Sequence, residues 1–201
     1  MESKSTPIKI WKMDIFDNKN KRRNICIIQQ CNCIRRKPHG LSLDFVKNLG
    51  GYANAYNRRM GKHSNTASVS SRPKCGEIGW SSPPFHRELP HIVHFYSQFD
   101  SGLSIESNNA SLEYGYLKDD VHFQDNKRLD TKANRVIYFE KCLEKLAEQL
   151  NGSMSSTISE VLFPYRIGCG KAGGSWEAYF ASIVRFDKKV KQTVKIAHKI
   201  K

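Results

Sequence analysis

The sequence of 201 residues predicts an α/β protein, a three-layer α-β-α sandwich built on a mixed, largely parallel sheet. Two observations lead to this prediction. Short apolar runs with the character of buried strands recur along the chain, and amphipathic helical patterns separate several of them. Strands that alternate with helices are typical of a sheet covered by helices on both faces. The length suffices for one domain, so we expect a single domain over 1–201 with its core at about 8–200.

The N-terminal half is expected to contribute two strands and two helices. A weak alternation of apolar residues indicates a first strand at 8–16, and the run ICIIQQ indicates a buried strand at 25–30. A loop then leads to a helix that begins at Gly40, carries apolar side chains at helical spacing and ends at Gly50. A second short helix is expected at 52–59.

The C-terminal half contains the clearest helical pattern of the chain. Apolar residues recur there at steps of three and four from Val136 to Leu150, which predicts an amphipathic helix packed on the sheet. The segments 61–74 and 100–131 are polar and irregular, and the second is predicted to be an insertion. The remaining elements are expected as strands at 91–97, 161–164 and 192–198 and a helix at 176–185.

Composition and charge limit the location, cofactors and partners that the protein can be expected to have. No run of about 20 apolar residues predicts a membrane span, and the N-terminus shows no secretory signal, so we expect a cytoplasmic or nuclear protein. The six cysteines are expected to be reduced, and their spacing does not match a zinc site, so no metal or other cofactor is predicted. The net charge of +14 favours a partner rich in phosphate.

The glycine-rich stretch PYRIGCGKAGG at 164–174 is the strongest functional signal. It follows a predicted buried strand, as does the loop at 31–40, and ligands of such sheets bind beyond the carboxyl ends of the strands. The stretch lacks the context of a dinucleotide fingerprint and the final Ser or Thr of a P-loop. Exposed backbone N–H groups before a helix can nevertheless bind phosphate. The alternative is that the glycines only form a tight turn, but one or two would suffice for that.

The segments NCIRRKPHGLSLDF and FPYRIGCGKAGGSW, together with MDIF at the end of the first strand, resemble a macro domain. The resemblance covers nearly the whole chain and is closest to the branch of ADP-ribose 1″-phosphate phosphatases and small ADP-ribosyl hydrolases. It implies binding of ADP-ribose or an ADP-ribosylated substrate. Asp14 would accept a hydrogen bond from the adenine amine, beside Ile15, and Asn32 would reach the distal ribose. The remaining implied contacts, to the ribose and the diphosphate, are Gly40, Leu41, Gly168, Cys169, Gly170, Ala172 and Gly173.

Catalysis is left open by the sequence. Ser175 and Ala172 stand where many relatives carry an acidic residue, and Gln98 stands where one hydrolase subgroup carries a lysine. His39 is the best candidate for a general base, with a simple ligand or solvent contact as the alternative. Two other functions compete with an ADP-ribosyl hydrolase or phosphatase: a non-catalytic reader of ADP-ribosylated protein, and a nucleic-acid-binding module that uses the basic surface.

Overall fold

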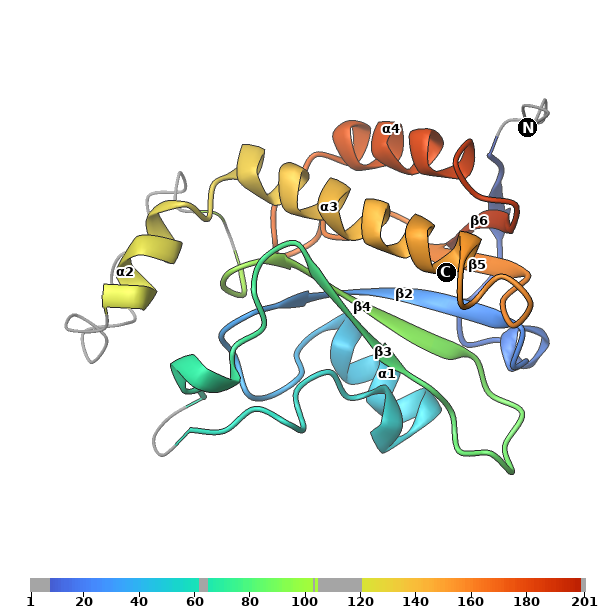
Figure 1. Cartoon of the computed structure of the whole chain (residues 1–201), viewed down its shortest axis with the longest axis horizontal. Coiled ribbons are helices and arrows are strands. Elements are labelled where there is room, and N and C mark those ends of the chain that lie inside the picture. The colour runs from blue at the N-terminus through green and yellow to red at the C-terminus, as the bar shows by residue number, and fades with distance from the viewer. Residues whose placement is uncertain (1–7, 62–64, 103, 105–120, 200–201) are drawn as a thin grey trace.

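The computed structural model describes residues 8–61, 65–102, 104 and 121–199, and these are organised around one six-stranded sheet (Figure 1). The strands are β1 (Ile10–Lys12), β2 (Ile25–Asn32), β3 (Glu77–Ser81), β4 (His91–Gln98), β5 (Glu160–Pro164) and β6 (Thr193–His198). Their order is β1-β6-β5-β2-β4-β3. Every neighbouring pair is parallel except β3, which runs antiparallel to β4 at one edge. The mixed, largely parallel sheet is therefore confirmed.

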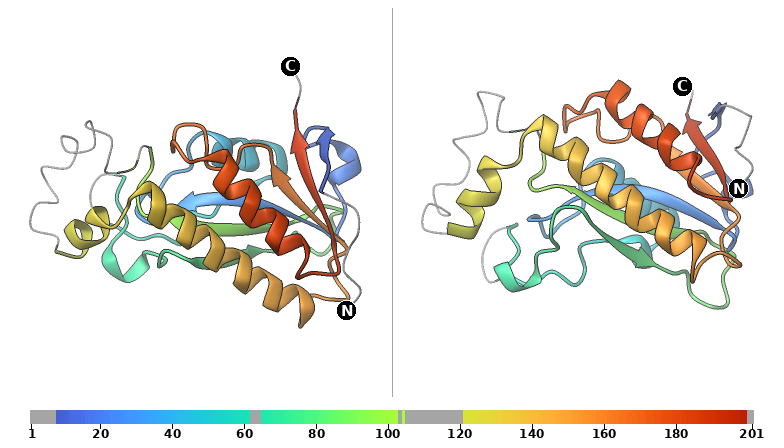
Figure 2. Two further views of the ribbon diagram at one scale, coloured as in Figure 1. Left: turned by 90° about the horizontal axis from the view of Figure 1, so that it is seen from above. Right: turned by 45° about the horizontal axis from the view of Figure 1, so that its top comes forward.

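Helices cover both faces of this sheet. Helices α3 (Lys132–Asn151) and α4 (Trp176–Asp187) lie side by side on one face, and α1 (Leu41–Leu49) covers the other (Figures 1 and 2). A further helix, α2 (Val121–Arg128), precedes α3 and projects beyond the sheet (Figure 1). The three-layer α-β-α architecture predicted from the sequence is thus the observed one.

The core is divided between the two faces by the period of two in the strands, because successive strand side chains point to opposite faces. Ile28 of β2 and Val93 of β4 pack under α3 and α4, where Phe139 lies in an edge-to-face contact with Phe95. The adjacent β2 residue, Ile27, packs with Phe45 and other residues on the α1 face. The central strands are buried on both sides, and their sequences are therefore largely apolar.

Two predicted elements are shorter than expected, and polar side chains explain both differences. The first strand ends at Lys12, because the Asp14 carboxylate accepts a hydrogen bond from the Phe16 N–H at 3.0 Å and turns the chain. The predicted helix at 52–59 is a short 3₁₀ turn, Gly51–Ala53, after which the Asn54 side chain accepts from the Tyr56 N–H at 3.0 Å.

Two elements were not predicted. Edge strand β3 contains Gly79 and is too short and polar to show a clear alternation. Helix α2 lies inside the segment 100–131, which was expected to be irregular. Most of that expected insertion, 103 and 105–120, lies outside the described residues.

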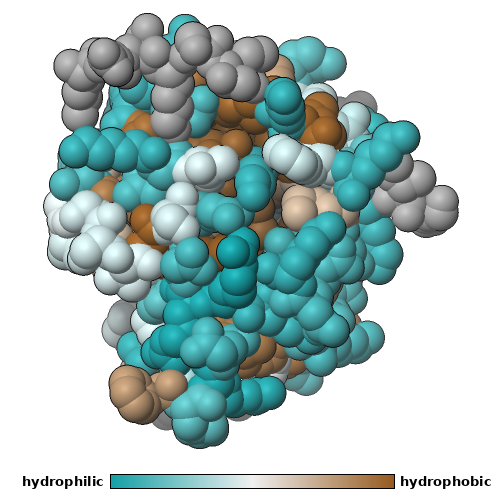
Figure 3. All heavy atoms as spheres, turned by 90° about the vertical axis from the view of Figure 1, so that its right-hand side faces the viewer, coloured by the Kyte–Doolittle hydropathy of each residue, from teal (hydrophilic) through white to brown (hydrophobic). Residues whose placement is uncertain are grey.

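No helix within the described ranges is long and apolar enough to span a bilayer. Figure 3 shows the face at the right-hand side of Figure 1, where hydrophilic residues predominate and apolar residues are confined to small separate areas. Such scattered apolar residues are normal on protein surfaces.

Candidate functional site

A cavity of about 690 Å³ lies at the carboxyl ends of β2, β4 and β5. Asn32 ends β2, Gln98 ends β4 and Tyr165 follows β5, and all three line the cavity. Parallel strands end at the same edge of a sheet, so the loops that follow them come together there. The volume is within the range of about 300–1,000 Å³ that is usual for small-molecule sites.

The two loops singled out in the sequence meet at this cavity. Of the residues expected at a ligand site, those that line it are Asn32, His39, Gly40, Leu41, Gly168, Gly170 and Ala172. Those that do not line it are Asp14, Ile15, Cys169 and Gly173. The structure therefore brings together the residues assigned to the ribose and most of those assigned to the diphosphate, while the pair assigned to adenine lies apart.

The glycine-rich loop after β5, residues 165–174, is called the late loop below, and the loop after β2, residues 31–40, the early loop. The glycines of the late loop are required for different structural reasons. Gly168 has φ 71°, and a Cβ there would lie 2.1 Å from Gln30 Oε1. A Cβ at Gly174 would lie 2.4 Å from the Tyr179 ring. At Gly168 the backbone conformation and the packing both require glycine, and at Gly174 the packing does. At Gly170 a Cβ would meet nothing within 4 Å, and this residue faces the cavity. Gly170 is thus the position where a missing side chain leaves room for a ligand.

The backbone N–H groups of the late loop are divided in the same way. Those of Cys169 and Gly173 donate within the loop, to Arg166 O and Gly170 O, both at 3.0 Å. Within the described part of the chain, the N–H groups of Gly170, Lys171 and Ala172 donate to no other protein atom. Three consecutive amides at the cavity wall are therefore available to an anion.

A helix N-terminus also lines the cavity, but it is that of α1 rather than that of α4. Gly40 precedes α1 with φ 53° and has no side chain to cap the helix, and Leu41 and Ser42 begin it at the cavity wall. The first residues of α4 are capped by Ser175, whose Oγ accepts from the Ala178 N–H, and they do not line the cavity. The partial positive charge of a helix start is therefore supplied by the early loop.

A buried arginine that the sequence reasoning missed holds the late loop in place. Arg135 of α3 is 1% exposed, and it donates to both carboxylate oxygens of Asp130 at 2.8 and 2.7 Å. It also donates to the carbonyl oxygens of Gly102 at 2.8 Å, Ala172 at 2.9 Å and Asp100 at 3.5 Å. A guanidinium has five N–H donors in a fixed plane. Arg135 therefore ties two walls of the cavity to the start of α3.

The same network extends to the early loop. Asp130 accepts from the backbone N–H groups of Phe99 and Asp100 at 3.1 and 3.2 Å. The Asp100 carboxylate in turn forms an ion pair with Arg35 Nε at 3.0 Å. Arg35 lines the cavity, so these contacts connect it through the segment after β4 to the late loop.

Asp14 is already paired in this structure. Its Oδ2 lies 2.7 Å from Lys199 Nζ, just beyond the end of β6. Burial opposes its ionisation, but hydrogen bonds from Lys199 and the Phe16 N–H outweigh burial and lower the pKa of Asp14. Tyr165, which lines the cavity, stacks on His198 with ring centroids 4.0 Å apart and so connects the cavity to this end of β6.

His39 is exposed at the cavity, and its Nε2 lies 3.1 Å from Asn65 Nδ2. The Asn65 carboxamide is oriented by the Arg36 N–H, which donates to Asn65 Oδ1 at 3.1 Å. Asn65 therefore donates to His39, whose Nε2 is the acceptor. A general base that uses this nitrogen would first have to exchange the Asn65 amide for a substrate or water.

Cysteine chemistry is not favoured at the site. Burial raises the pKa of Cys169 to about 11, and its Sγ–H donates to Ile167 O at 3.3 Å, so the residue is a thiol at neutral pH. Across the described ranges, no group of three or more His, Cys, Asp or Glu side chains is arranged to hold a metal ion.

Several cavity residues were not expected from the sequence. Tyr56 and Asn65 come from segments without a motif, and Ser101 and Gly102 follow β4. Of the unexpected cavity residues, Arg166 is the one that the sequence could have indicated, because it lies two residues before Gly168 of the glycine-rich loop. It has φ 54°, the only positive value of a non-glycine residue in the described chain. Such backbone strain costs about 1–3 kcal/mol and is often found at functional sites.

Comparisons with known proteins give a match in structure but not in sequence. No protein-family model matches the sequence, and no curated protein matches it. The macrodomain of Mycobacterium tuberculosis DarG superposes with a TM-score of 0.58 at 15% identity, covering 94% of this chain and 96% of that one. The macrodomain of Thermus aquaticus DarG gives 0.54 at 12% identity, covering 87% and 89%. An alphavirus protein described as P23pro-zbd gives 0.54 at 11% identity, covering 97% of this chain and 22% of that one.

Two of these structures are macrodomains, and the match covers almost the full length of each. They share with this chain the arrangement of a mixed sheet between helical layers. At this level of identity the likeness concerns the fold. The chain therefore has the fold of a macrodomain.

Proposed function

We propose that the cavity at the carboxyl ends of the strands binds ADP-ribose, either free or attached to a larger substrate. The observation that carries this proposal is the late loop, in which Gly170 is open to the cavity and three successive N–H groups have no partner among the described residues. These amides suit the diphosphate, because phosphate oxygens accept hydrogen bonds from such a row of donors.

The charge of the lining supports an anionic ligand. Arg35, Arg166 and Lys171 line the cavity, and among its described lining residues there is no Asp or Glu. Each cation near a phosphate adds a charge-assisted contact. Asn32 and Tyr56 at the base of the cavity offer an amide and a hydroxyl for ribose hydroxyl groups. They already lie within hydrogen-bond distance of each other, at 3.4 Å.

Adenine would lie at the end of the cavity marked by Tyr165, beyond which Asp14 is found. In this proposal the adenine amine donates to Asp14, and Lys199 yields part of its present contact. Both side chains are near the surface, so this exchange is inexpensive compared with breaking a buried pair.

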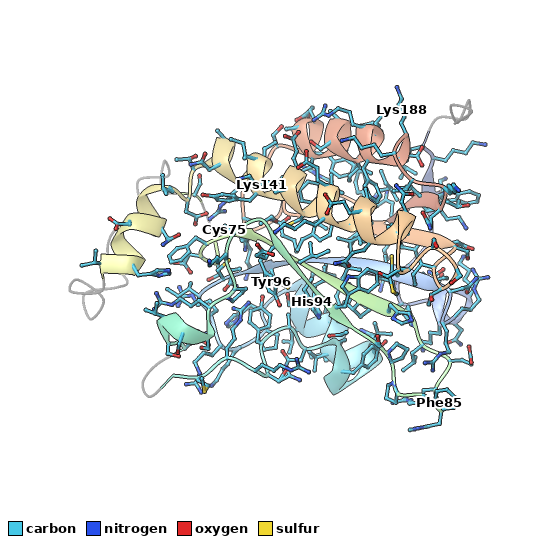
Figure 4. All side chains as sticks on the ribbon, viewed as in Figure 1. Cys75, Phe85, His94, Tyr96, Lys141 and Lys188 are labelled. Carbon is cyan, nitrogen blue, oxygen red and sulfur yellow. The ribbon has the colours of Figure 1, made fainter. Side chains whose placement is uncertain are left out.

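The first test is calorimetric titration with ADP-ribose, with AMP as the control ligand. ADP-ribose should bind with micromolar affinity that AMP does not match, because AMP lacks the distal ribose and one phosphate. Gly170→Glu should abolish binding by directing a carboxylate at the diphosphate. Lys188→Gln changes the net charge by the same amount on a remote surface (Figure 4) and should bind as the wild type does. Equal binding to the two variants would refute the proposed site.

Turnover remains a second proposal. Hydrolysis of ADP-ribose 1″-phosphate or of an ADP-ribosyl linkage would depend on His39, since no carboxylate among the described residues lines the cavity. A reader of ADP-ribosylated protein would share the pocket without turnover. Binding of nucleic acid by the basic surface would instead show a steep salt dependence that ADP-ribose does not compete away.

A further inference from the structure

A second cavity, of about 620 Å³, lies on the α1 side of the sheet near its β3 edge. His94 and Tyr96, labelled in Figure 4, are alternate residues of β4 on the same face as Ile92, which packs toward α1. Gly79 and Ser81 of β3 complete this wall. The opposite wall comes from the segments 52–59 and 70–73, which the proposed ADP-ribose site does not use except at Tyr56.

A buried cation without a carboxylate partner faces this cavity. Arg59 is 7% exposed, and its guanidinium donates to the carbonyl oxygens of Asn32 and Arg35. It also donates to Asn32 Oδ1 at 3.5 Å. It lies over two aromatic rings, 4.3 Å from the Tyr56 centroid and 5.6 Å from that of Tyr96. No Asp or Glu of the described chain lies within salt-bridge distance of it. Buried charges are normally paired, so an anion is the missing partner.

The rest of the lining suits an anion with several oxygens. Arg58 is exposed at the cavity and forms no hydrogen bond or ion pair with another described residue, and Arg72 adds a third guanidinium. Ser71 and Ser81 supply hydroxyl groups. The described lining residues include no carboxylate that would repel an anion. Arg72 also donates to Ala67 O at 2.9 Å and lies 3.1 Å from His122 Nδ1, which holds its guanidinium in place. Guanidinium groups bind phosphate in a bidentate manner, and three arginines line this cavity.

The floor of the cavity is polar but neutral. Burial, with a smaller contribution from Arg59, lowers the pKa of His94 to about 3. His94 therefore acts as a hydrogen-bonding group, 2.8 Å from Ser81 Oγ through Nε2 and 2.8 Å from Gln29 Oε1 through Nδ1. The Gln29 Nε2 group behind it is buried and has no hydrogen-bond partner among the residues that the structure describes. This floor orients Ser81 toward the cavity without adding a charge of its own.

We propose that this second cavity binds a phosphate group, with the cations of Arg58, Arg59 and Arg72 as its partners. The phosphate could come from a small phosphorylated compound or from the backbone of a single-stranded nucleic acid, and both present the same chemistry. The proposal concerns a site separate from the ADP-ribose site and does not depend on it. The two are neighbours, because Asn32 lines the first cavity while its carbonyl oxygen binds Arg59 of the second.

The test uses Gly170→Glu protein, so that the first cavity does not contribute, and two probes: inorganic pyrophosphate and a short oligothymidylate. Calorimetry at low salt measures the affinity of each. Arg58→Gln should weaken the better probe about tenfold, the loss expected for one charge-assisted contact. Arg185→Gln on α4 removes the same charge from a remote exposed position and should leave the affinity within about twofold, as expected for a screened surface charge.

A second readout locates the binding. In NMR spectra, the backbone amide signals of Gly79 and Ser81 should shift during the titration. Arg59→Lys keeps the charge but removes the paired N–H donors of the guanidinium, so the shifts should be smaller in this variant. Tighter binding of the oligothymidylate with a salt dependence that falls in Arg58→Gln identifies a nucleic-acid source, and equal or tighter binding of pyrophosphate identifies a small compound. If neither probe bound, the proposal would be overturned. It would also be overturned if Arg58→Gln and Arg185→Gln bound the better probe with equal affinity.

Discussion

Replacing Arg135 by methionine is the most informative perturbation of the proposed ADP-ribose site, because one buried side chain links both the fold and the cavity. The guanidinium is 1% exposed and binds the two carboxylate oxygens of Asp130 at 2.8 and 2.7 Å. Methionine fills much of the same space but leaves Asp130 as a buried charge without its cation. It also removes the donor from the Ala172 carbonyl, which is 2.9 Å from the guanidinium in the wild type.

The expected loss of stability follows from this geometry. Removal of one partner of a buried ion pair costs about 3–5 kcal/mol, because the other charge stays buried. The backbone N–H groups of Phe99 and Asp100 still solvate Asp130, which places the loss toward the lower end, at about 3 kcal/mol. At ~2–4 °C per kcal/mol for a chain of this size, the midpoint of thermal unfolding should fall by roughly 10 °C.

The assay is thermal and urea unfolding of wild type, Arg135→Met and a matched control, Arg185→Gln. The control removes an arginine whose side chain is 60% exposed and which pairs with Glu140, an interaction worth less than about 1 kcal/mol. At a temperature where Arg135→Met is folded, its affinity for ADP-ribose should also be reduced at least tenfold, because Ala172 and its neighbours lose their anchor. If Arg135→Met and Arg185→Gln were equally stable and bound equally well, the network would not hold the loop and the reasoning would be refuted.

Three further predictions concern single residues of the site. Gly168→Ala should cost about 2 kcal/mol or more in urea unfolding, because it combines a positive φ with a steric clash, whereas Gly170→Ala should stay within about 0.5 kcal/mol of wild type and affect only ligand affinity. Asp14 has a lowered pKa in the folded protein, so the stability it contributes is present above its ordinary value of 3.8 and is lost as the pH falls through the folded pKa. The difference in unfolding free energy between wild type and Asp14→Asn should therefore be constant from about pH 7 to 5 and shrink below about pH 4, and a constant difference at all pH values would contradict the pairing with Lys199. His39→Ala should lower any turnover of ADP-ribose 1″-phosphate more than it lowers ADP-ribose affinity, and unchanged turnover would remove His39 as the base.

Local patterns in the sequence were sufficient for most of the fold. The buried strands β2, β4 and β5 are largely apolar because both of their faces are covered, and α3 carries its apolar residues at helical spacing because one side packs on the sheet. These features depend on the period of the element itself. The first strand and the segment 52–59 were misjudged because side-chain hydrogen bonds of Asp14 and Asn54 compete with regular structure there, and apolar periodicity does not report them.

The candidate site, too, could be predicted from the sequence only in part. The sequence alone determined that the early loop and the glycine-rich loop follow buried strands, and the parallel order of those strands places both loops at one edge of the sheet. Only the tertiary structure decided which glycines are required by packing and which is open. That depends on Gln30, which lies far away in the chain, and on how the ring of Tyr179 in α4 packs against the loop. It also decided that Arg135 anchors the late loop and that Arg59 lacks an acidic partner in the described part of the chain. Burial and charge pairing are contacts between distant residues, and no local pattern in the chain encodes them.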